Sequence, residues 1–238
     1  MYSPRFSQKW EKAPSEEVAC KVGEAGLSLS DITTEKEEVQ KRILHLHNKL
    51  RSKVSPPAQD MLKMEWNLEN AQSSQKIADQ CKMVPDESDG HHKTYAENLF
   101  KSPKAVPWEK VLAKWIVPKV YFKYGLGSVE PGAPIETYLK MVWYSTHEIG
   151  CAVAHCPGDE YLYVCHYSPI GFKPKSMFTP YEKGPRCGRC LDHCNNGLCP
   201  NRCDYYDVRQ DCRTLGDICD DGLQYVCKAT CYCRNEIA

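Results

Sequence analysis

The sequence predicts an α+β domain followed by a small module that disulfides hold together. Three observations support this prediction. Apolar side chains recur at helical spacing in the first half of the chain, and two β-rich runs follow without strict alternation of strands and helices. Ten of the fifteen cysteines fall in the last 52 residues, a density typical of a disulfide scaffold.

Three helices are expected in the first half of the chain. Residues 35–54 open with an acidic turn and end before Pro56-Pro57, and their apolar side chains recur at three- and four-residue steps: Val39, Ile43, Leu46, Leu50 and Val54. A second helix is expected over residues 65–82. A third begins near Pro107, a residue suited to the first turn of a helix, and ends or kinks at Pro118.

An antiparallel β-hairpin is expected after these helices. Residues 149–156 and 161–167 are rich in strand-forming side chains and flank a turn cluster, Pro157-Gly-Asp-Glu. Residues 138–144 just before them are compatible with either a helix end or a strand. The remaining segments are expected to be irregular: a loose arm over residues 1 to about 33, a polar loop over 84–95 and a proline-rich linker over 172–186.

Charge and cysteine content limit the environment in which this chain works. It has 31 basic and 31 acidic side chains, so net charge gives no general reason to expect nucleic acid or an anionic membrane as a partner. No apolar run approaches the ~20 residues that a transmembrane helix needs.

Disulfides persist in oxidising surroundings, so the cysteines predict a secreted, extracellular protein. Residues 1–23 lack the apolar stretch of a secretory signal, so we expect that a signal was removed or that the start is non-standard.

Several motifs in order resemble one known family. Residues 47–51 (His-Asn-Lys-Leu-Arg), 64–66 (Met-Glu-Trp) and 97–100 (Glu-Asn-Leu-Phe) are similar to the helical motifs of the CAP domain, and residues 141–153 and 161–171 resemble its two long signatures. The cysteine-rich tail resembles that of the cysteine-rich secretory proteins (CRISPs). Residues 226–237 look most like mammalian epididymal or sperm-associated members.

This resemblance implies an α-β-α sandwich and a five-part chain. In order along the chain, the expected parts are a flexible arm (1–35), a CAP (SCP/PR-1-like) domain (36–172), a linker (173–186), a disulfide hinge (187–202) and a short-helical ion-channel-regulator-like (ShKT-like) module (203–238). The last of these is similar to sea-anemone potassium-channel toxins.

The resemblance also implies a disulfide pattern, which the spacing alone leaves open. The implied pairs are Cys81–Cys156, Cys151–Cys165, Cys187–Cys194, Cys190–Cys199, Cys203–Cys233, Cys212–Cys227 and Cys219–Cys231. Two further family cysteines, which pair with each other, are replaced here by Tyr95 and Ser168. Because both cysteines of this pair are replaced, neither leaves an unpaired cysteine behind. Cys20 lies outside the pattern, and we expect a free thiol on the arm rather than a link between chains.

Many CAP domains gather two histidines and two glutamates in a cleft that can bind a divalent metal. At the matching positions this chain has Pro85, Pro118 and Thr137, and only Glu97 remains. One carboxylate makes neither a zinc site nor an acid–base pair, so we expect no metal, no cofactor and no catalytic residue. His91-His92 are expected to be solvated, and Ser145-Thr146-His147-Glu148 is not a triad on sequence grounds alone.

Function is therefore expected to lie in binding to a cell-surface protein or cation channel. Candidate contacts in the tail are Lys228, Tyr225, Tyr232 and Arg213, since Tyr and Arg are frequent at binding hot spots. In gamete-associated relatives the segment matching Tyr161 to Gly171 is implicated in egg binding. Here most of this segment is expected to be core, and only exposed alternates such as Leu162 or His166, and the loop that follows, would meet a partner. The alternatives are a venom or defence-type channel blocker, and a metal-dependent hydrolase or sterol- or lipid-binding CAP protein.

Overall fold

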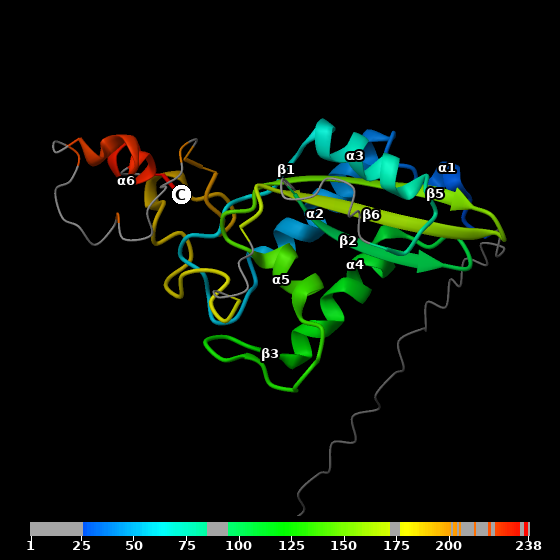
Figure 1. The fold of residues 1–238 in the computed structure, drawn as a ribbon, viewed down its shortest axis with the longest axis horizontal. Coiled ribbons are helices and arrows are strands. Elements are labelled where there is room, and N and C mark those ends of the chain that lie inside the picture. Colours follow the sequence, from blue (N-terminus) through cyan, green and yellow to red (C-terminus); the bar gives the residue numbers. More distant parts are fainter. Residues whose placement is uncertain are drawn as a thin grey trace, which may run out of the picture.

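The fold is a three-layer sandwich with the disulfide-rich tail docked at one end (Figure 1). It is seen in a computed structural model, which describes residues 26–84, 95–171, 177–200, 202–203, 205, 212, 219, 222–233 and 236–237. The middle layer is a sheet of four strands in the order β1-β5-β6-β2. Their bounds are β1 Glu65–Trp66, β2 Ala96–Ser102, β5 Glu148–Cys156 and β6 Glu160–Ser168.

Strands β5 and β6 form the antiparallel hairpin that the sequence predicts. Strand β2 pairs antiparallel along β6, and the short β1 runs parallel to β5. Helix α3 (Leu68–Ala78) covers one face of the sheet. Helices α2 (Glu37–Arg51), α4 (Trp108–Ile116) and α5 (Glu136–Val142) lie on the other face (Figure 1). This arrangement is the α-β-α sandwich that the resemblance implies.

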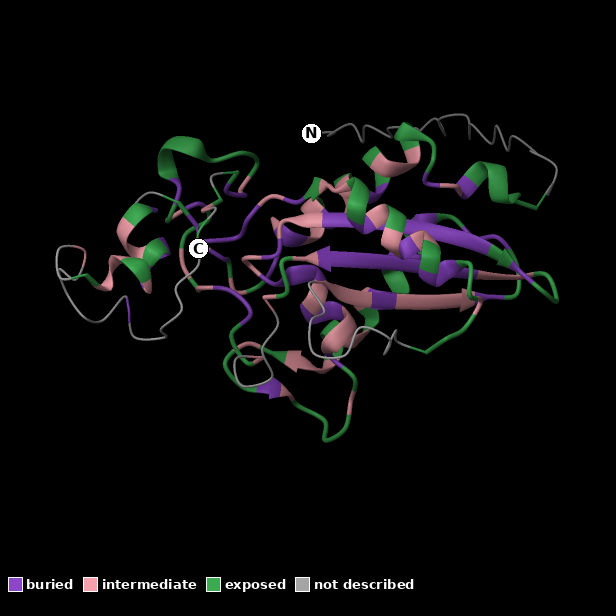
Figure 2. Cartoon of the chain, turned by 45° about the horizontal axis from the view of Figure 1, so that its top comes forward, coloured by how far each residue is buried: buried purple, intermediate pink, exposed green. Residues whose placement is uncertain are grey.

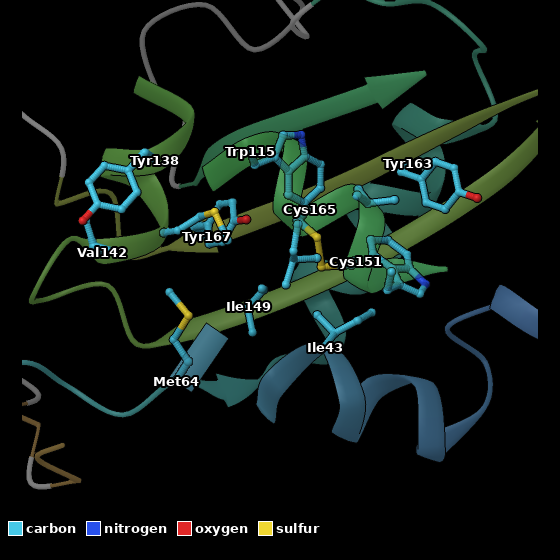
Figure 3. Close-up of a cluster of buried hydrophobic side chains, with 14 of the residues drawn as sticks. Ile43, Met64, Trp115, Tyr138, Val142, Ile149, Cys151, Tyr163, Cys165 and Tyr167 are labelled. Carbon is cyan, nitrogen blue, oxygen red and sulfur yellow. A yellow bond between two sulfur atoms is a disulfide. The ribbon is translucent and has the colours of Figure 1, made fainter. Parts of the chain in front are cut away.

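Two hydrophobic clusters fill the space between the layers, because side chains alternate along each strand. On β5, Cys151 and Val153 belong to the larger cluster, whereas Ala152 and Ala154 belong to the smaller one under α3. Figure 3 shows the larger cluster around the Cys151–Cys165 disulfide, which joins directly opposite residues of β5 and β6. Both central strands are buried along most of their length (Figure 2).

The predicted helices form, with shifted ends. The Asn67 side chain caps α3 by accepting from the Asn70 N–H at 2.8 Å, so the helix begins after Trp66 and not at residue 65. Helix α4 ends at Ile116, and Pro118 lies in the 3-10 helix η1 (Val117–Tyr121) that continues it. The ambiguous residues 138–144 are mostly helical, in α5.

Two of the three motifs interpreted as helical are strands. Residues 64–66 lead into and form β1, and residues 97–100 lie within β2. The reason is the sheet itself: the seven residues of β2 pair in register with β6, from Ala96 opposite Tyr167 to Ser102 opposite Tyr161. Two short strands that the sequence did not suggest, β3 (Phe122–Lys123) and β4 (Gly127–Ser128), form a small hairpin after η1.

Segments expected to be loose pack against the sandwich where the structure describes them. Residues Leu29–Ile32 form a short helix, α1, whose buried Ile32 accepts a hydrogen bond from the Trp108 indole at 2.8 Å. In the expected linker, Tyr181 is buried, and the Glu182 backbone N–H donates to the Asp60 carboxylate at 2.9 Å. The five-part division stays a prediction, but the described residues of both segments pack against the sandwich.

The tail docks on the sandwich through the segment before β1. The Cys199 N–H donates to Met61 O at 2.9 Å, and the Lys63 N–H donates to Cys199 O at 2.8 Å. Between these bonds Leu62 is buried with three hinge cysteines: Cys187, Cys190 and Cys199. A 3-10 turn, η3 (Leu191–His193), lies within the hinge. Beyond the hinge come the 3-10 helix η5 (Leu223–Tyr225) and helix α6 (Lys228–Tyr232).

Seven disulfides lie in this part of the chain and in the sandwich. They are Cys81–Cys156, Cys151–Cys165, Cys187–Cys194, Cys190–Cys199, Cys203–Cys233, Cys212–Cys227 and Cys219–Cys231, the same pairs that the resemblance implies. Cys20 lies outside the described residues. Within those residues, no helix has the length and apolar character needed to cross a bilayer.

Candidate functional site

Glu97, the one acidic side chain left from the family cleft, is engaged by a buried histidine. Glu97 lies on β2 directly opposite His166 on β6, and its Oε2 is 3.0 Å from His166 Nε2. His166 Nδ1 is 2.6 Å from the Ser73 hydroxyl on α3, and the Tyr95 ring stacks on the imidazole at 3.8 Å. We call Ser73, Tyr95, Glu97 and His166 the His166 cluster.

Sequence reasoning missed His166 as a partner of Glu97 because the two are 69 residues apart and meet only through the β2–β6 register. Hydrogen bonds link Ser73 to His166 and His166 to Glu97, in the same sequence of groups as in a hydrolase triad. However, the His166 side chain is fully buried and that of Glu97 is 7% exposed. Ser73 also contacts its own helix, with its hydroxyl 3.0 Å from Asn70 O. The arrangement therefore crosslinks α3, β6 and β2 and offers a substrate little access.

The same β2–β6 register explains the two missing family cysteines. The ladder ends with Ala96 opposite Tyr167, and Tyr95 and Ser168 are the next residues beyond this last pair. A disulfide at these two positions would tie the strand ends covalently. Here the stacking of Tyr95 on His166 ties them instead, and the Ser168 hydroxyl donates to Glu148 at 2.9 Å.

The other family metal positions supply no ligand. Pro118 lies in η1, and the Thr137 hydroxyl donates to Trp115 O at 3.2 Å. Pro85 and His91-His92 fall outside the described residues. Among the residues that the structure does describe, the clusters with metal-like spacing are two, and disulfides occupy their cysteines: Cys187, Cys190 and Cys199, and Cys203 and Cys233 with Glu236. Among the described residues, Glu97 and His166 are not joined by the further ligands that a zinc site needs.

The tail presents a second candidate site, which we call the tail surface: Tyr205, Tyr225, Lys228 and Tyr232. Tyr225 is 70% exposed, Tyr232 is 56% exposed, and Lys228 at the start of α6 is also exposed. The Tyr205 and Tyr232 rings are 5.5 Å apart. Three disulfides hold this module: two of them flank α6 through Cys227 and Cys233, and the third joins Cys231 within α6 to Cys219. Arg213 falls outside the described residues.

Two family models match most of the chain. The model described as the cysteine-rich secretory protein family (CAP) matches residues 44–167, and the Crisp model matches residues 187–238. The chain belongs to the cysteine-rich secretory protein family.

Similar CRISPs are known from mammals. Human cysteine-rich secretory protein 2 is 39% identical over 214 residues, which cover 87% of this chain and 88% of the relative. Cysteine-rich secretory protein 2 of Cavia porcellus is 38% identical over 87% of this chain and 88% of its own length, and human cysteine-rich secretory protein 3 is 38% identical over 87% of each.

Solved structures share the fold of the CAP domain. The structure of NaASP2 with Zn²⁺ is 26% identical, with a TM-score of 0.57 over 69% of this chain and 96% of the other. The structure of BmVAL-1 is 25% identical, with a TM-score of 0.56 over 69% of this chain and 91% of the other.

The expected contact residues of the second CAP signature are not at the surface. Leu162 and His166 are both fully buried, so the prediction that they face a partner is wrong. Leu162 packs in the smaller core under α3, and His166 joins the His166 cluster, because β6 is covered on both faces. Within the segment from Tyr161 to Gly171, Pro169 and Ile170 are the exposed residues.

His47, the first residue of the motif at residues 47–51, also has an internal role. It is fully buried and its Nδ1 donates to Ile43 O at 2.9 Å, which leaves Nε2 to accept from the Tyr167 hydroxyl at 3.1 Å. Burial lowers the pKa of His47 to about 4, so the ring is neutral at physiological pH.

Proposed function

We propose that this CRISP is a secreted, non-enzymatic binding protein that acts through its tail surface on a cell-surface protein, a cation channel in the first instance. The observation that supports this most directly is the exposure of Tyr225 and Tyr232 on either side of Lys228, on a module held by three disulfides.

The chemistry of the tail surface suits recognition. Tyrosine presents a large, rigid contact area with a polar end, and a lysine matches the cation-attracting mouth of a channel. A crosslinked module loses little conformational entropy on binding, so more of the contact energy appears as affinity. The seven disulfides also agree with an extracellular location, since they persist in an oxidising compartment.

Current recording with the full-length oxidised protein tests this proposal on calcium, potassium and ryanodine-type channels. The full chain is required because the hinge shares a hydrophobic cluster with Leu62 of the CAP domain. We expect Lys228→Ala or Tyr232→Ala to raise the concentration for half-maximal effect by about tenfold or more. Leu191→Ala, at an exposed hinge position, is the matched control. Equal potency of all variants would exclude the tail surface as the contact.

A sperm or egg surface is the proposed biological setting, supported by the similarity of residues 226–237 to sperm-associated members. Labelled protein is expected to bind sperm or egg membranes saturably, and unlabelled protein should compete. Expression confined to a venom gland or to defence tissue would instead favour the alternative of a venom or defence-type channel blocker.

The rival function is that of a metal-dependent hydrolase or a sterol- or lipid-binding protein. One structural relative, NaASP2, was solved with Zn²⁺, but here Glu97 pairs with His166, and the described residues place no metal-ligand cluster at this pair. We expect less than stoichiometric zinc after equilibration and dialysis. One bound zinc per chain that Glu97→Ala removes, and that the neighbouring Glu136→Ala retains, would support the metal-dependent alternative.

A further inference from the structure

The small β3–β4 hairpin and the η1 turn before it are anchored by aromatic side chains. The Phe122 ring lies 5.8 Å from that of Tyr138 in the core, and the Tyr124 hydroxyl donates to Tyr181 O at 2.7 Å. The Gly125 N–H donates to Phe178 O at 2.7 Å. These contacts hold the hairpin in place, so its outward side chains form a defined surface.

The outward side of this segment is apolar. Val117, Val120, Leu126 and Val129 are 53%, 72%, 58% and 50% exposed. Val117 and Val120 are three residues apart in a 3-10 helix and therefore share a side of it. We call these four side chains, together with Lys119 and Lys123, the Val120 face.

The β3–β4 pairing brings the two ends of this face together. The Val129 N–H donates to Tyr121 O at 2.8 Å, which places Val129 beside the end of η1, next to Val120. The hairpin projects away from the sheet and its helices (Figure 1), and the loops around it are exposed (Figure 2). The Val120 face is therefore open to solvent.

The charges on this segment have one sign. Residues 111–129 contain Lys114, Lys119 and Lys123 and no Asp or Glu, and Glu130 is the first acidic residue that follows. All three lysines are exposed, and none forms an ion pair with a described residue. Three exposed lysines thus lie on the same segment as the exposed aliphatic side chains, and the nearest acidic residue in the sequence is Glu130, just after Val129.

We propose that the Val120 face docks peripherally on an anionic phospholipid membrane. Scattered exposed apolar residues are ordinary on protein surfaces, but exposed aliphatic side chains grouped with lysines on one segment suit a membrane surface, where the acyl region is apolar and anionic headgroups attract lysine. The aliphatic side chains enter the headgroup region, and the lysine stems lie along it with their ammonium groups near lipid phosphates. This proposal is independent of the tail surface and needs no channel.

Vesicle co-sedimentation of the full-length oxidised protein tests the proposal. We expect binding to phosphatidylcholine vesicles that contain phosphatidylserine, weak binding to pure phosphatidylcholine, and loss of binding at high salt. Lys119→Glu with Lys123→Glu should weaken partition by about tenfold or more. Val120→Ser with Leu126→Ser should weaken binding at both salt concentrations. Circular dichroism would verify that each variant is folded.

Matched controls use exposed residues elsewhere on the described surface. Leu68→Ser with Val84→Ser removes two side chains that are 64% and 60% exposed, and Lys49→Glu with Lys53→Glu reverses two exposed lysines at the end of α2 and just after it. We expect both control variants to bind vesicles as the wild type does. Equal binding by the hairpin variants and the controls would overturn the proposal. So would salt-insensitive extraction of single lipids from neutral vesicles, or no vesicle binding at all.

Discussion

Arg51 shows how a single side chain can organise the middle of the CAP domain. Its guanidinium is 1% exposed and donates to the carbonyl oxygens of five residues at 2.8 to 3.1 Å: Leu62, Met141, Trp143, Tyr144 and Thr146. Burial lowers the pKa of Arg51 to about 9, so the group stays charged at neutral pH. One residue at the end of α2 thereby donates hydrogen bonds to carbonyl groups of the turn between α5 and β5 and of the segment to which the tail docks.

Replacing Arg51 by Met should destabilise the protein by about 3 kcal/mol or more, because several buried carbonyl groups lose their donors at once. Urea unfolding under non-reducing conditions measures this loss. The matched control is Arg42→Met, since Arg42 is 63% exposed and forms only a long ion pair with Glu109, at 3.5 Å. A variant at Arg51 as stable as this control would contradict the assignment.

His47 makes the stability depend on pH. Its pKa is about 4 in the folded protein and near 6.5 when unfolded, so its contribution is fully present above pH 6.5 and is lost as pH falls towards 4. From pH 7.5 to pH 5 this loss amounts to about 2 kcal/mol. In His47→Gln the fall in unfolding free energy over this range should be smaller by about that amount.

Asp60 makes stability depend on pH in the opposite direction to His47. Burial raises its pKa to about 6, above the ordinary value of 3.8, so its contribution is present at low pH and is lost as pH rises through 6. Asp60→Asn removes the stabilisation that Asp60 gains on protonation, so the fall in unfolding free energy from pH 7.5 to pH 5 should become larger by about 1 kcal/mol. If both variants changed the pH dependence in the same direction, the two pKa assignments would be wrong.

At the scale of elements, the close contact of α3 with β5 depends on one glycine. A Cβ atom on Gly150 would overlap the backbone of Asn67, Asn70 and Ala71, with Asn67 O only 2.6 Å away. Residue 150 must therefore be glycine for the cap and first turn of α3 to lie on the strand. A helix contact of this kind is invisible in the local sequence.

Gly150→Ala should lower the free energy of unfolding by about 2 kcal/mol or more, since α3 must shift away from the sheet. Gly26→Ala is the matched control, because a Cβ atom added there would meet nothing within 4 Å and the backbone at Gly26 is unstrained. Thermal unfolding of the oxidised proteins compares the two. A loss at Gly150 no larger than that at Gly26 would mean that α3 accommodates the added methyl group.

At the scale of the whole molecule, the tail and the CAP domain are parts of one packed body. The segment from Met61 to Lys63 exchanges backbone hydrogen bonds with Cys199, and Arg189 forms an ion pair with Glu182 at 2.9 Å. A tail surface that contacts a channel is thus presented at a defined orientation relative to the CAP domain, including its Val120 face.

Leu62→Ala should loosen this docking and lower the free energy of unfolding by about 2–4 kcal/mol, as for other buried leucines. Limited proteolysis between residues 186 and 203 should become faster. Leu68→Ala is the control, with a leucine that is 64% exposed. Unchanged cleavage in the Leu62 variant would indicate that the disulfides alone hold the hinge.

Local periodicity predicts α2, α3, α4 and the β5–β6 hairpin, and the family motifs imply the disulfide pattern that cysteine spacing leaves open. The remaining features depend on contacts between segments far apart in the chain. The strand character of β2, the burial of Leu162 and the pairing of Glu97 with His166 all depend on which strands become neighbours and in what register. The Val120 face likewise forms only when Phe122 and Tyr124 turn inward to the core and leave their valine and lysine neighbours outside.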